Sequence, residues 1–235
     1  ANVMKLLEVV RGAKTAPDVL ATAMDIGKTI GKVAVVSGVC YGFIGNRMAE
    51  VYMREAEFLL LEGATPGQID QAIESLGLAM GPCRMLDMAG IDVGAKTVIE
   101  YEKAGGLPPD ATYRVVVRKL FEQGQFGQKT GAGYYRYEGR TPLANPQTQA
   151  TCDALAAQHG IARRSDISAT EITERLIYSM VNEGARILEE GIAARPVDID
   201  AIWLHGYGFP SWRGGLLFWA EREGLGRIAT AVQRY

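Results

Sequence analysis

The chain has 235 residues, of which 48% are hydrophobic, and its 25 basic and 27 acidic residues give a formal net charge of -2. The charges are interspersed and form no basic stripe, which excludes nucleic acid and anionic membrane surfaces as favoured partners. The apolar content suffices for one large domain or two smaller ones. No apolar run approaches the length of a membrane-spanning helix, and no signal peptide is recognisable. We therefore expect a soluble, cytoplasmic, globular protein.

The cysteines and histidines give no sign of a bridged or metal-bound fold. Cys40, Cys83 and Cys152 are far apart and show no CxxC spacing. An odd number of separated cysteines is typical of a reducing compartment, so we expect free thiols. His159 and His205 are the only histidines, and neither lies in a metal-ligand pattern. No metal site is predicted.

The first segment has the pattern strand, helix, strand. Residues 3–10 are almost continuously apolar and favour a buried strand. Thr15 is the expected N-cap of a helix that runs to about Ile30, and residues 32–36 predict a second strand. Three elements cannot close a doubly wound sheet by themselves. Glu8 interrupts the first strand, and its carboxylate either forms a salt bridge or orients a catalytic base.

A long amphipathic helix is predicted over residues 42–63. Its apolar side chains recur at three- and four-residue spacing, and Gly63 stands where a C-cap glycine would. Asn46 falls in the first turn, either as an ordinary helix-start residue or as a side chain that contacts a substrate oxygen. Thr65 is expected to cap the next helix. Further helices are predicted over residues 85–90, 93–103, 113–123 and 152–158.

A glycine-rich loop over residues 124–137 leads into an aromatic extended segment. It differs from a phosphate-binding P-loop because Gln128 separates Gly127 from Lys129, and because a helix instead of a strand precedes it. Lys129 is therefore either simply solvated or able to reach a phosphate or a cofactor edge.

The second half of the chain repeats the first. Several residues of the predicted long helix recur at one constant offset, and others recur after a two-residue shift. The pairs are Arg47 and Arg175, Glu55 and Glu183, Glu62 and Glu190, Gly63 and Gly191, Pro66 and Pro196, Ile69 and Ile199, and Asp70 and Asp200. This predicts duplication of one unit of long helix, short helix and proline-containing loop. Glu55 and Glu183 fall on the apolar faces, where a structural role is favoured.

Several strings together resemble one enzyme family. They are residues 3–10, residues 42–47, Glu62-Gly63 followed by Ile69-Asp70, Gly81-Pro82 with Asp87, and residues 127–135. In this order they resemble the 3-hydroxyacyl-CoA dehydrogenases. Residues 182–191 and 206–215 are similar to the second helical domain of the multifunctional fatty-acid oxidation enzymes.

The resemblance implies a mainly α fold with a short β-α-β piece at its start. Residues 1–37 would be the end of a Rossmann NAD-binding domain, 38–140 a first helical domain, 141–168 a linker, and 169–235 a second helical domain. The helical domains would be similar to the C-terminal domain of 6-phosphogluconate dehydrogenase.

The resemblance also implies a reaction and a set of site residues. The family oxidises the 3-hydroxyl of a 3-hydroxyacyl-CoA to a 3-oxoacyl-CoA with NAD in fatty-acid beta-oxidation, and a histidine accepts the hydroxyl proton. By motif match, Glu8 would orient that histidine, and Asn46 would bind the reacting oxygen of the substrate. Lys129 would reach the cofactor. His205 would stand where relatives often place a tyrosine near the substrate.

The sequence also departs from the family pattern. The family's histidine and glycine-rich NAD-binding turn would precede Ala1, so we expect the cofactor domain to be missing and this piece to be inactive alone. Whether an enoyl-CoA hydratase domain accompanies it in the parent protein is left open.

Two other functions stay open from the sequence. In the first, the chain is a non-catalytic helical module for packing or homodimerisation, and the aromatic residues near Trp212 and Trp219 form a core or an interface. In the second, the protein is a dehydrogenase of sugars or hydroxy acids. The tandem duplication and the loop around Lys129 argue against this second alternative.

Overall fold

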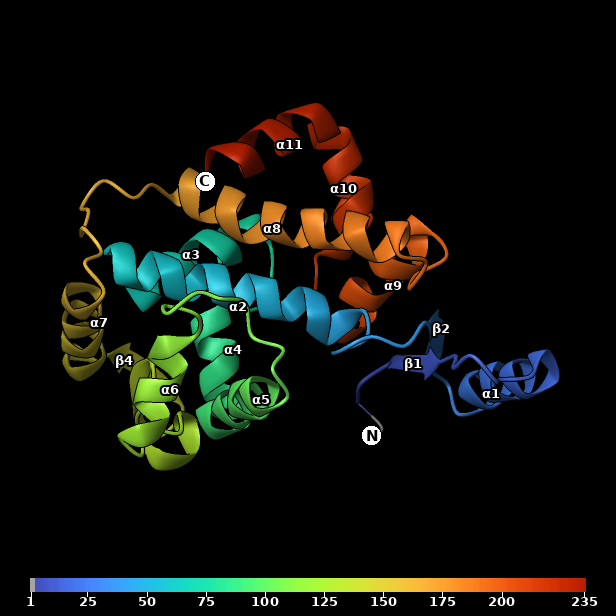
Figure 1. The fold of residues 1–235 in the computed structure, drawn as a ribbon, viewed down its shortest axis with the longest axis horizontal. Helices are drawn as coiled ribbons and strands as arrows, with labels where there is room; N and C mark the ends of the chain where they lie inside the picture. The colour runs from blue at the N-terminus through green and yellow to red at the C-terminus, as the bar shows by residue number, and fades with distance from the viewer. Residues whose placement is uncertain (1–2) are drawn as a thin grey trace. The chain divides into compact units, whose positions relative to one another are not determined.

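The structure is a computed structural model that describes residues 3–235, so the first two residues of the predicted Rossmann piece lie outside it. The chain is mainly helical (Figure 1). It divides into two compact units. The first unit contains Ala1–Tyr52, Gly77–Ala79 and Glu174–Tyr235, and the second contains Met53–Leu76 and Met80–Thr173. Two long helices, α2 (Gly45–Glu62) and α8 (Ala169–Glu189), contribute residues to both units.

The first unit begins with the predicted β-α-β segment. Strands β1 (Leu6–Val10) and β2 (Val33–Ser37) pair in parallel, and α1 (Pro17–Thr29) connects them. The predicted cap of α1 was wrong, because Ala16 precedes the helix and supplies no side-chain cap. Thr15 instead closes a turn, with its Oγ1 accepting the Gly12 N–H at 3.0 Å.

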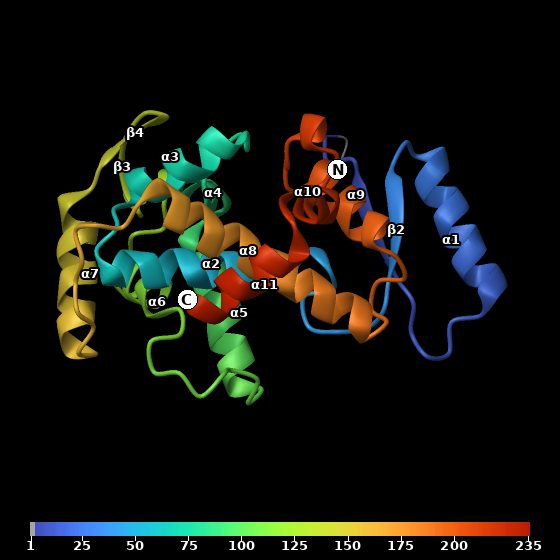
Figure 2. The same ribbon diagram turned by 90° about the horizontal axis from the view of Figure 1, so that it is seen from above.

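Helices cover both faces of this two-stranded sheet. Helix α9 (Pro196–Gly206) packs against β1 and β2 from one side, and α1 packs on the other (Figure 2). The first unit is completed by η2 (Ser211–Arg213), α10 (Leu216–Glu223) and α11 (Leu225–Arg234). The sheet therefore holds the residues of β1 close to the end of α9.

Helix α2 begins three residues later than predicted. Gly42 and Phe43 have φ values of 75° and 51°, so they form a turn before the first helical residue, Gly45. At the other end Gly63 has a φ of 127°, a conformation that favours glycine, and it ends the helix as predicted. The apolar face of α2 is buried, with Met48 and Leu59 fully inaccessible.

The second unit is built from helices and one hairpin. Its elements are α3 (Pro66–Leu76), α4 (Pro82–Ala89), α5 (Ile91–Lys103), α6 (Val115–Glu122), η1 (Gln128–Thr130), β3 (Tyr135–Glu138), β4 (Thr141–Ala144) and α7 (Pro146–Gln158). The predicted Thr65 cap is confirmed: Thr65 Oγ1 accepts the Gln68 N–H at 3.2 Å, and Gln68 Oε1 accepts the Thr65 N–H at 2.9 Å. Helix α7 starts six residues before its predicted start, because Asn145 caps it.

Asp70 and Asp200, which the sequence repeat pairs, perform the same structural task. In the second unit, Asp70 accepts the N–H groups of Cys83 and Arg84 at the start of α4, at 2.9 and 3.0 Å. In the first unit, Asp200 accepts the Leu217 N–H at the start of α10, at 2.6 Å. A carboxylate on the short helix of each repeat thus caps the next helix.

Candidate functional site

Glu8 lies in the middle of β1 and binds the start of α2. Its Oε2 accepts the Ile44 N–H at 3.0 Å, and its Oε1 accepts the Gly45 N–H at 3.2 Å. Burial raises the pKa of Glu8, while the two backbone N–H groups oppose that rise. The sequence left open a salt bridge for this carboxylate, but its hydrogen bonds go to backbone amides instead.

Asn46 and Tyr207 lie beside this carboxylate. Asn46 is exposed in the first turn of α2, and its Oδ1 accepts the hydroxyl of Tyr207 at 2.8 Å. A Cβ at Gly45 would stand 2.6 Å from the Tyr207 hydroxyl and 2.8 Å from Glu8 Oε1, so only glycine leaves room for both groups. We call Glu8, Gly45, Asn46 and Tyr207 the Glu8 cluster. It joins β1, the start of α2 and the end of α9.

Sequence reasoning missed Tyr207. It lies in the string over residues 206–215, which the resemblance assigned to the second helical domain without giving this tyrosine a role. His205, two residues earlier, is exposed in the last turn of α9. Tyr207, and not His205, extends from the end of α9 to Asn46. The resemblance to the family pointed to this part of the chain, but it singled out the neighbouring histidine.

Arg47 anchors the start of α2 next to the cluster. Its Nε donates to Glu183 at 2.6 Å, and its two terminal nitrogens donate to Glu190 at 2.6 and 2.8 Å. Both glutamates belong to the end of the second long helix and its following turn. The structural role expected for Glu183 is therefore confirmed. Its bond to Arg47 holds the first turn of α2, which carries Asn46.

Lys129 lies in the second unit, on η1. Its Nζ pairs with Asp92 in the first turn of α5 and lies 5.8 Å from the centre of the Phe126 ring. Lys129 lowers the pKa of Asp92. The lysine side chain is half exposed. It therefore presents a cation that Asp92 holds in place.

Asp87 at the end of α4 folds the glycine-rich loop around Lys129. Its carboxylate accepts the N–H groups of Tyr134 and Tyr135, both at 2.9 Å, and the hydroxyl of Tyr137 at 3.0 Å. A Cβ at Gly133 would stand only 2.0 Å from Asp87 Oδ1. Glycine at this position leaves room for the buried carboxylate. The packing against Asp87 therefore accounts for the glycine, and no bound phosphate is needed to explain it.

Two buried aspartates make the stability of the second unit depend on pH. Asp70 and Asp87 are 2% and 1% exposed, and burial raises the pKa of each to about 6 against opposing hydrogen bonds. An unfolded aspartate has a pKa of about 4, so between these values the folded state binds more protons. The stabilisation from these groups is therefore complete below about pH 4 and is lost as the pH rises through about 6.

We expect the wild type to lose about 2–3 kcal/mol of unfolding free energy relative to Asp87→Asn between about pH 4 and pH 7. The asparagine does not titrate, so the difference isolates one carboxylate. Urea unfolding followed by circular dichroism at several pH values measures it. Asp166→Asn, at an exposed position of the same unit, is the control: Arg164 lowers the pKa of Asp166, so the wild type should show no such loss relative to this variant. A difference that is constant or that grows with pH would contradict this account.

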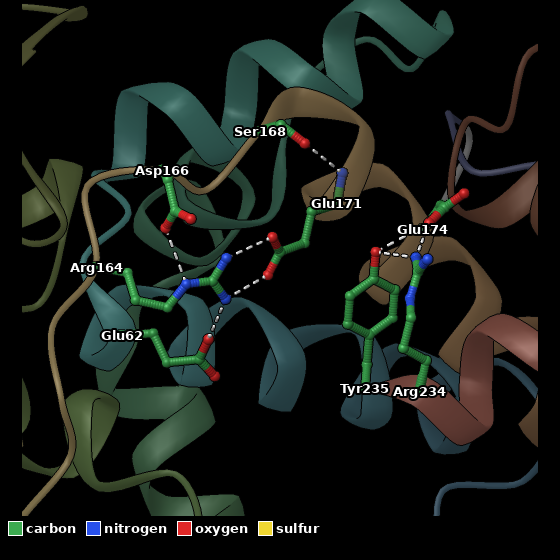
Figure 3. Close-up of polar contacts among 8 residues, drawn as sticks. All are labelled: Glu62, Arg164, Asp166, Ser168, Glu171, Glu174, Arg234 and Tyr235. Atoms are coloured by element: carbon green, nitrogen blue, oxygen red, sulfur yellow. Dashed lines mark hydrogen bonds and ion pairs between the residues drawn. The ribbon is translucent and has the colours of Figure 1, made fainter.

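A charged cluster around Arg164 holds a connecting segment in place. Arg164 donates to Glu171 through both terminal nitrogens at 2.9 and 2.8 Å and to Asp166 at 3.0 Å, and it pairs with Glu62 at 3.7 Å (Figure 3). Ser168 Oγ accepts the Glu171 N–H at 3.1 Å and so caps α8. These bonds fix the segment that connects α7 to α8.

A separate cluster in the first unit holds the end of the chain. Glu174 on α8 accepts a bond from Arg234 at 2.8 Å and one from the Tyr235 hydroxyl at 3.0 Å. Within residues 3–235, no group of three or more histidine, cysteine or acidic side chains is placed to bind a metal ion. No helix of the described chain has the length and apolar character needed to cross a bilayer.

Comparison with protein families agrees with this arrangement. The model "3-hydroxyacyl-CoA dehydrogenase, C-terminal domain" matches residues 42–137 and again residues 172–234. The model "3-hydroxyacyl-CoA dehydrogenase, NAD binding domain" matches residues 1–40. The chain belongs to the 3-hydroxyacyl-CoA dehydrogenase family. The double match of one model confirms the repeat, and the family uses NAD, of whose binding domain this chain carries a small piece.

Curated relatives of this family member are multifunctional. The chain is 45% identical over its whole length to a peroxisomal bifunctional enzyme of Danio rerio and 42% identical to one of Homo sapiens, and it covers 34% of each. It is 35% identical to a glyoxysomal fatty acid beta-oxidation multifunctional protein of Cucumis sativus, of which it covers 33%. The chain thus spans about a third of the length of these relatives.

Solved structures show the same fold. A 3-hydroxybutyryl-CoA dehydrogenase from Escherichia coli K12 superposes with a TM-score of 0.77 at 24% identity, covering 98% of this chain and 63% of that one. The dehydrogenase part of multifunctional enzyme 1 from C. elegans superposes with a TM-score of 0.63 at 29% identity, covering 88% of this chain and 46% of that one. The mainly helical fold with a short β-α-β start is therefore established.

Proposed function

We propose that this chain supplies part of the active site of an NAD-dependent 3-hydroxyacyl-CoA dehydrogenase of fatty-acid beta-oxidation. The reaction oxidises a 3-hydroxyacyl-CoA to a 3-oxoacyl-CoA. The observation that carries the proposal is the Glu8 cluster, in which a half-buried carboxylate lies next to an exposed asparagine on a rigid helix start. The matched ranges of the two family models, which contain all four residues of this cluster, support it.

The two side chains have complementary tasks in this proposal. Glu8 orients a histidine supplied by another segment and stabilises the imidazolium that forms when the histidine takes the hydroxyl proton. Asn46 binds the substrate oxygen, on which negative charge grows as that proton leaves. A bound NAD would supply the hydride acceptor for the carbon that carries this oxygen. Lys129 on the second unit is proposed to contact the cofactor, and His205 to lie near the substrate.

The described residues fit only part of an NAD site. They provide two parallel strands and one connecting helix, and the turn between β1 and α1 lacks the glycine pattern that binds a pyrophosphate. We therefore propose that a complete NAD-binding domain must be joined to this chain. In this organisation residues 1–37 end that domain, 38–140 and 169–235 are the helical domains, and 141–168 link them.

This proposal predicts that the 235-residue chain alone forms no NADH from 3-hydroxybutyryl-CoA and NAD, because the proton acceptor and most of the cofactor site lie elsewhere. The measurement is the rise in NADH absorbance, with circular dichroism to show that the chain is folded. Robust turnover by the chain alone would contradict the proposed division of the site.

A second candidate function is a packing or dimerisation module. Helix α1 and Ile30, the residue that follows it, expose three apolar side chains: Val19, Ile26 and Ile30 are 58%, 55% and 58% exposed. An exposed apolar face of this kind marks a contact with another part of the protein or with another copy. Light scattering over a range of concentrations distinguishes contact with another copy from contact with another part of the protein, since only a self-associating module changes mass with concentration.

The location and the wider protein are also proposals. The cytoplasm stays a prediction from the sequence, while the relatives named above are peroxisomal or glyoxysomal proteins. Fluorescence microscopy of a tagged full-length protein decides between these compartments. We propose that the parent protein is multifunctional, and an enoyl-CoA hydratase domain is the expected second activity.

A further inference from the structure

We infer that Tyr207 is a positioning residue that fixes the Asn46 carboxamide with its NH2 group turned toward the substrate. The inference rests on the proposed function, in which Asn46 binds the reacting oxygen. It adds a residue from the second repeat to a site whose other members lie in β1 and at the start of α2. The duplicated helical region then contributes directly to the active site.

The hydrogen bond determines which end of the amide is presented. The Tyr207 hydroxyl donates to Asn46 Oδ1 at 2.8 Å. Burial and the nearby charge of Glu8 raise the pKa of Tyr207, which keeps the hydroxyl protonated as a donor. A carboxamide carries its oxygen and its nitrogen on opposite sides of one planar carbon. With the oxygen engaged, the exposed side chain of Asn46 presents N–H donors.

Tyr207 itself is held by its surroundings. Its ring centre lies 4.7 Å from that of Trp203, which is 1% exposed, and the Trp203 indole N–H points to Met48 Sδ on α2 at 3.3 Å. The absence of a side chain at Gly45 lets the tyrosine approach the helix start, since a Cβ there would lie 2.7 Å from Tyr207 Cε2. The phenol therefore has little freedom to leave Asn46.

This arrangement suits an oxygen that gains negative charge. An amide that rotates freely would offer its own oxygen to the substrate for part of the time, which repels an alkoxide-like oxygen. An N–H donor that is already oriented needs no reorganisation during the reaction, and such preorganised donors stabilise developing charge best. Tyr207 is thus expected to act on the rate through Asn46 and to have little influence on substrate affinity.

The first test uses the 235-residue chain itself. Tyr207→Phe keeps the ring and removes only the hydroxyl, and Tyr178→Phe is the matched control in the same unit. Nuclear magnetic resonance of the Asn46 side-chain NH2 is expected to show a shifted signal and faster motion in Tyr207→Phe and no change in Tyr178→Phe. An Asn46 signal that is unaffected by Tyr207→Phe would overturn the inference.

The second test uses the dehydrogenase with a complete NAD-binding domain and 3-hydroxybutyryl-CoA as the probe. Tyr207→Phe is expected to lower kcat about tenfold with KM nearly unchanged, and to cause no further loss when Asn46 is already alanine. Equal losses from Tyr207→Phe in both backgrounds would overturn the inference and leave the role of Asn46 intact. An Asn46→Ala variant with full activity would overturn the proposed function and this inference together.

Discussion

Glu57→Ala is expected to lower the free energy of unfolding by about 3–5 kcal/mol, because it removes a buried carboxylate that faces the buried charge of Arg114. Glu57 on α2 and Arg114 before α6 are each 1% exposed, and Arg114 Nη1 lies 3.4 Å from Glu57 Oε1. The Glu57 carboxylate also accepts the N–H groups of Val116 and Val117 at 2.9 and 3.3 Å and the Tyr134 hydroxyl at 3.2 Å. Urea unfolding measures the loss.

Two control variants separate the effect of burial on the free energy of unfolding from the effect of losing any ion pair. Glu102→Ala removes the partner of Arg118 at a half-exposed site of the same unit and should cost about 1 kcal/mol or less. Glu57→Gln keeps the volume of the side chain and an acceptor oxygen, so its cost should lie between the two. If Glu57→Ala lowered the free energy of unfolding no more than Glu102→Ala does, the buried Glu57 carboxylate would contribute no more stability than a half-exposed ion pair.

The second large effect is expected on activity, in the dehydrogenase with a complete NAD-binding domain. Glu8→Gln should lower kcat by about 100- to 10,000-fold, because the neutral side chain no longer stabilises an imidazolium. Asn46→Ala should lower it by about 100- to 1,000-fold through loss of a donor to the reacting oxygen. Steady-state kinetics with 3-hydroxybutyryl-CoA and NAD give both values.

Glu138→Gln makes the same chemical change as Glu8→Gln at an exposed position and should leave kcat unchanged. Thermal unfolding of each variant shows whether a loss of rate comes from a loss of fold, since the glutamine side chain of the Glu8→Gln variant still offers one acceptor oxygen to the start of α2. Unchanged kinetics in both site variants would remove Glu8 and Asn46 from the proposed active site.

Features set by near neighbours in sequence were predicted well. The Thr65 cap depends on Gln68 three residues later. The repeat paired Asp70 with Asp200, but their shared role as caps of helices 13 and 17 positions along the chain emerged only from the structure. The Thr15 cap failed although it was also local, because Gly12 supplies a competing partner and places Thr15 in a turn.

Features set by distant residues were not predicted. Glu57 meets the Val116 N–H 59 positions later, and Asn46 meets Tyr207 161 positions later. Helical periodicity assigns a side chain to a face but does not identify the group that the fold brings to it. The resemblance to the family led to Glu8 and Asn46 as proposed site residues, but Tyr207 became a candidate only because the structure places the end of α9 beside the start of α2.

We propose that this chain carries the glutamate and the asparagine of a 3-hydroxyacyl-CoA dehydrogenase site. The decisive experiment joins the chain to the complete NAD-binding domain of a family member and measures NADH formation from 3-hydroxybutyryl-CoA. We expect turnover that Glu8→Gln abolishes almost completely. A folded, NAD-binding fusion that forms no NADH, or one whose Glu8→Gln variant is equally active, would contradict this proposal.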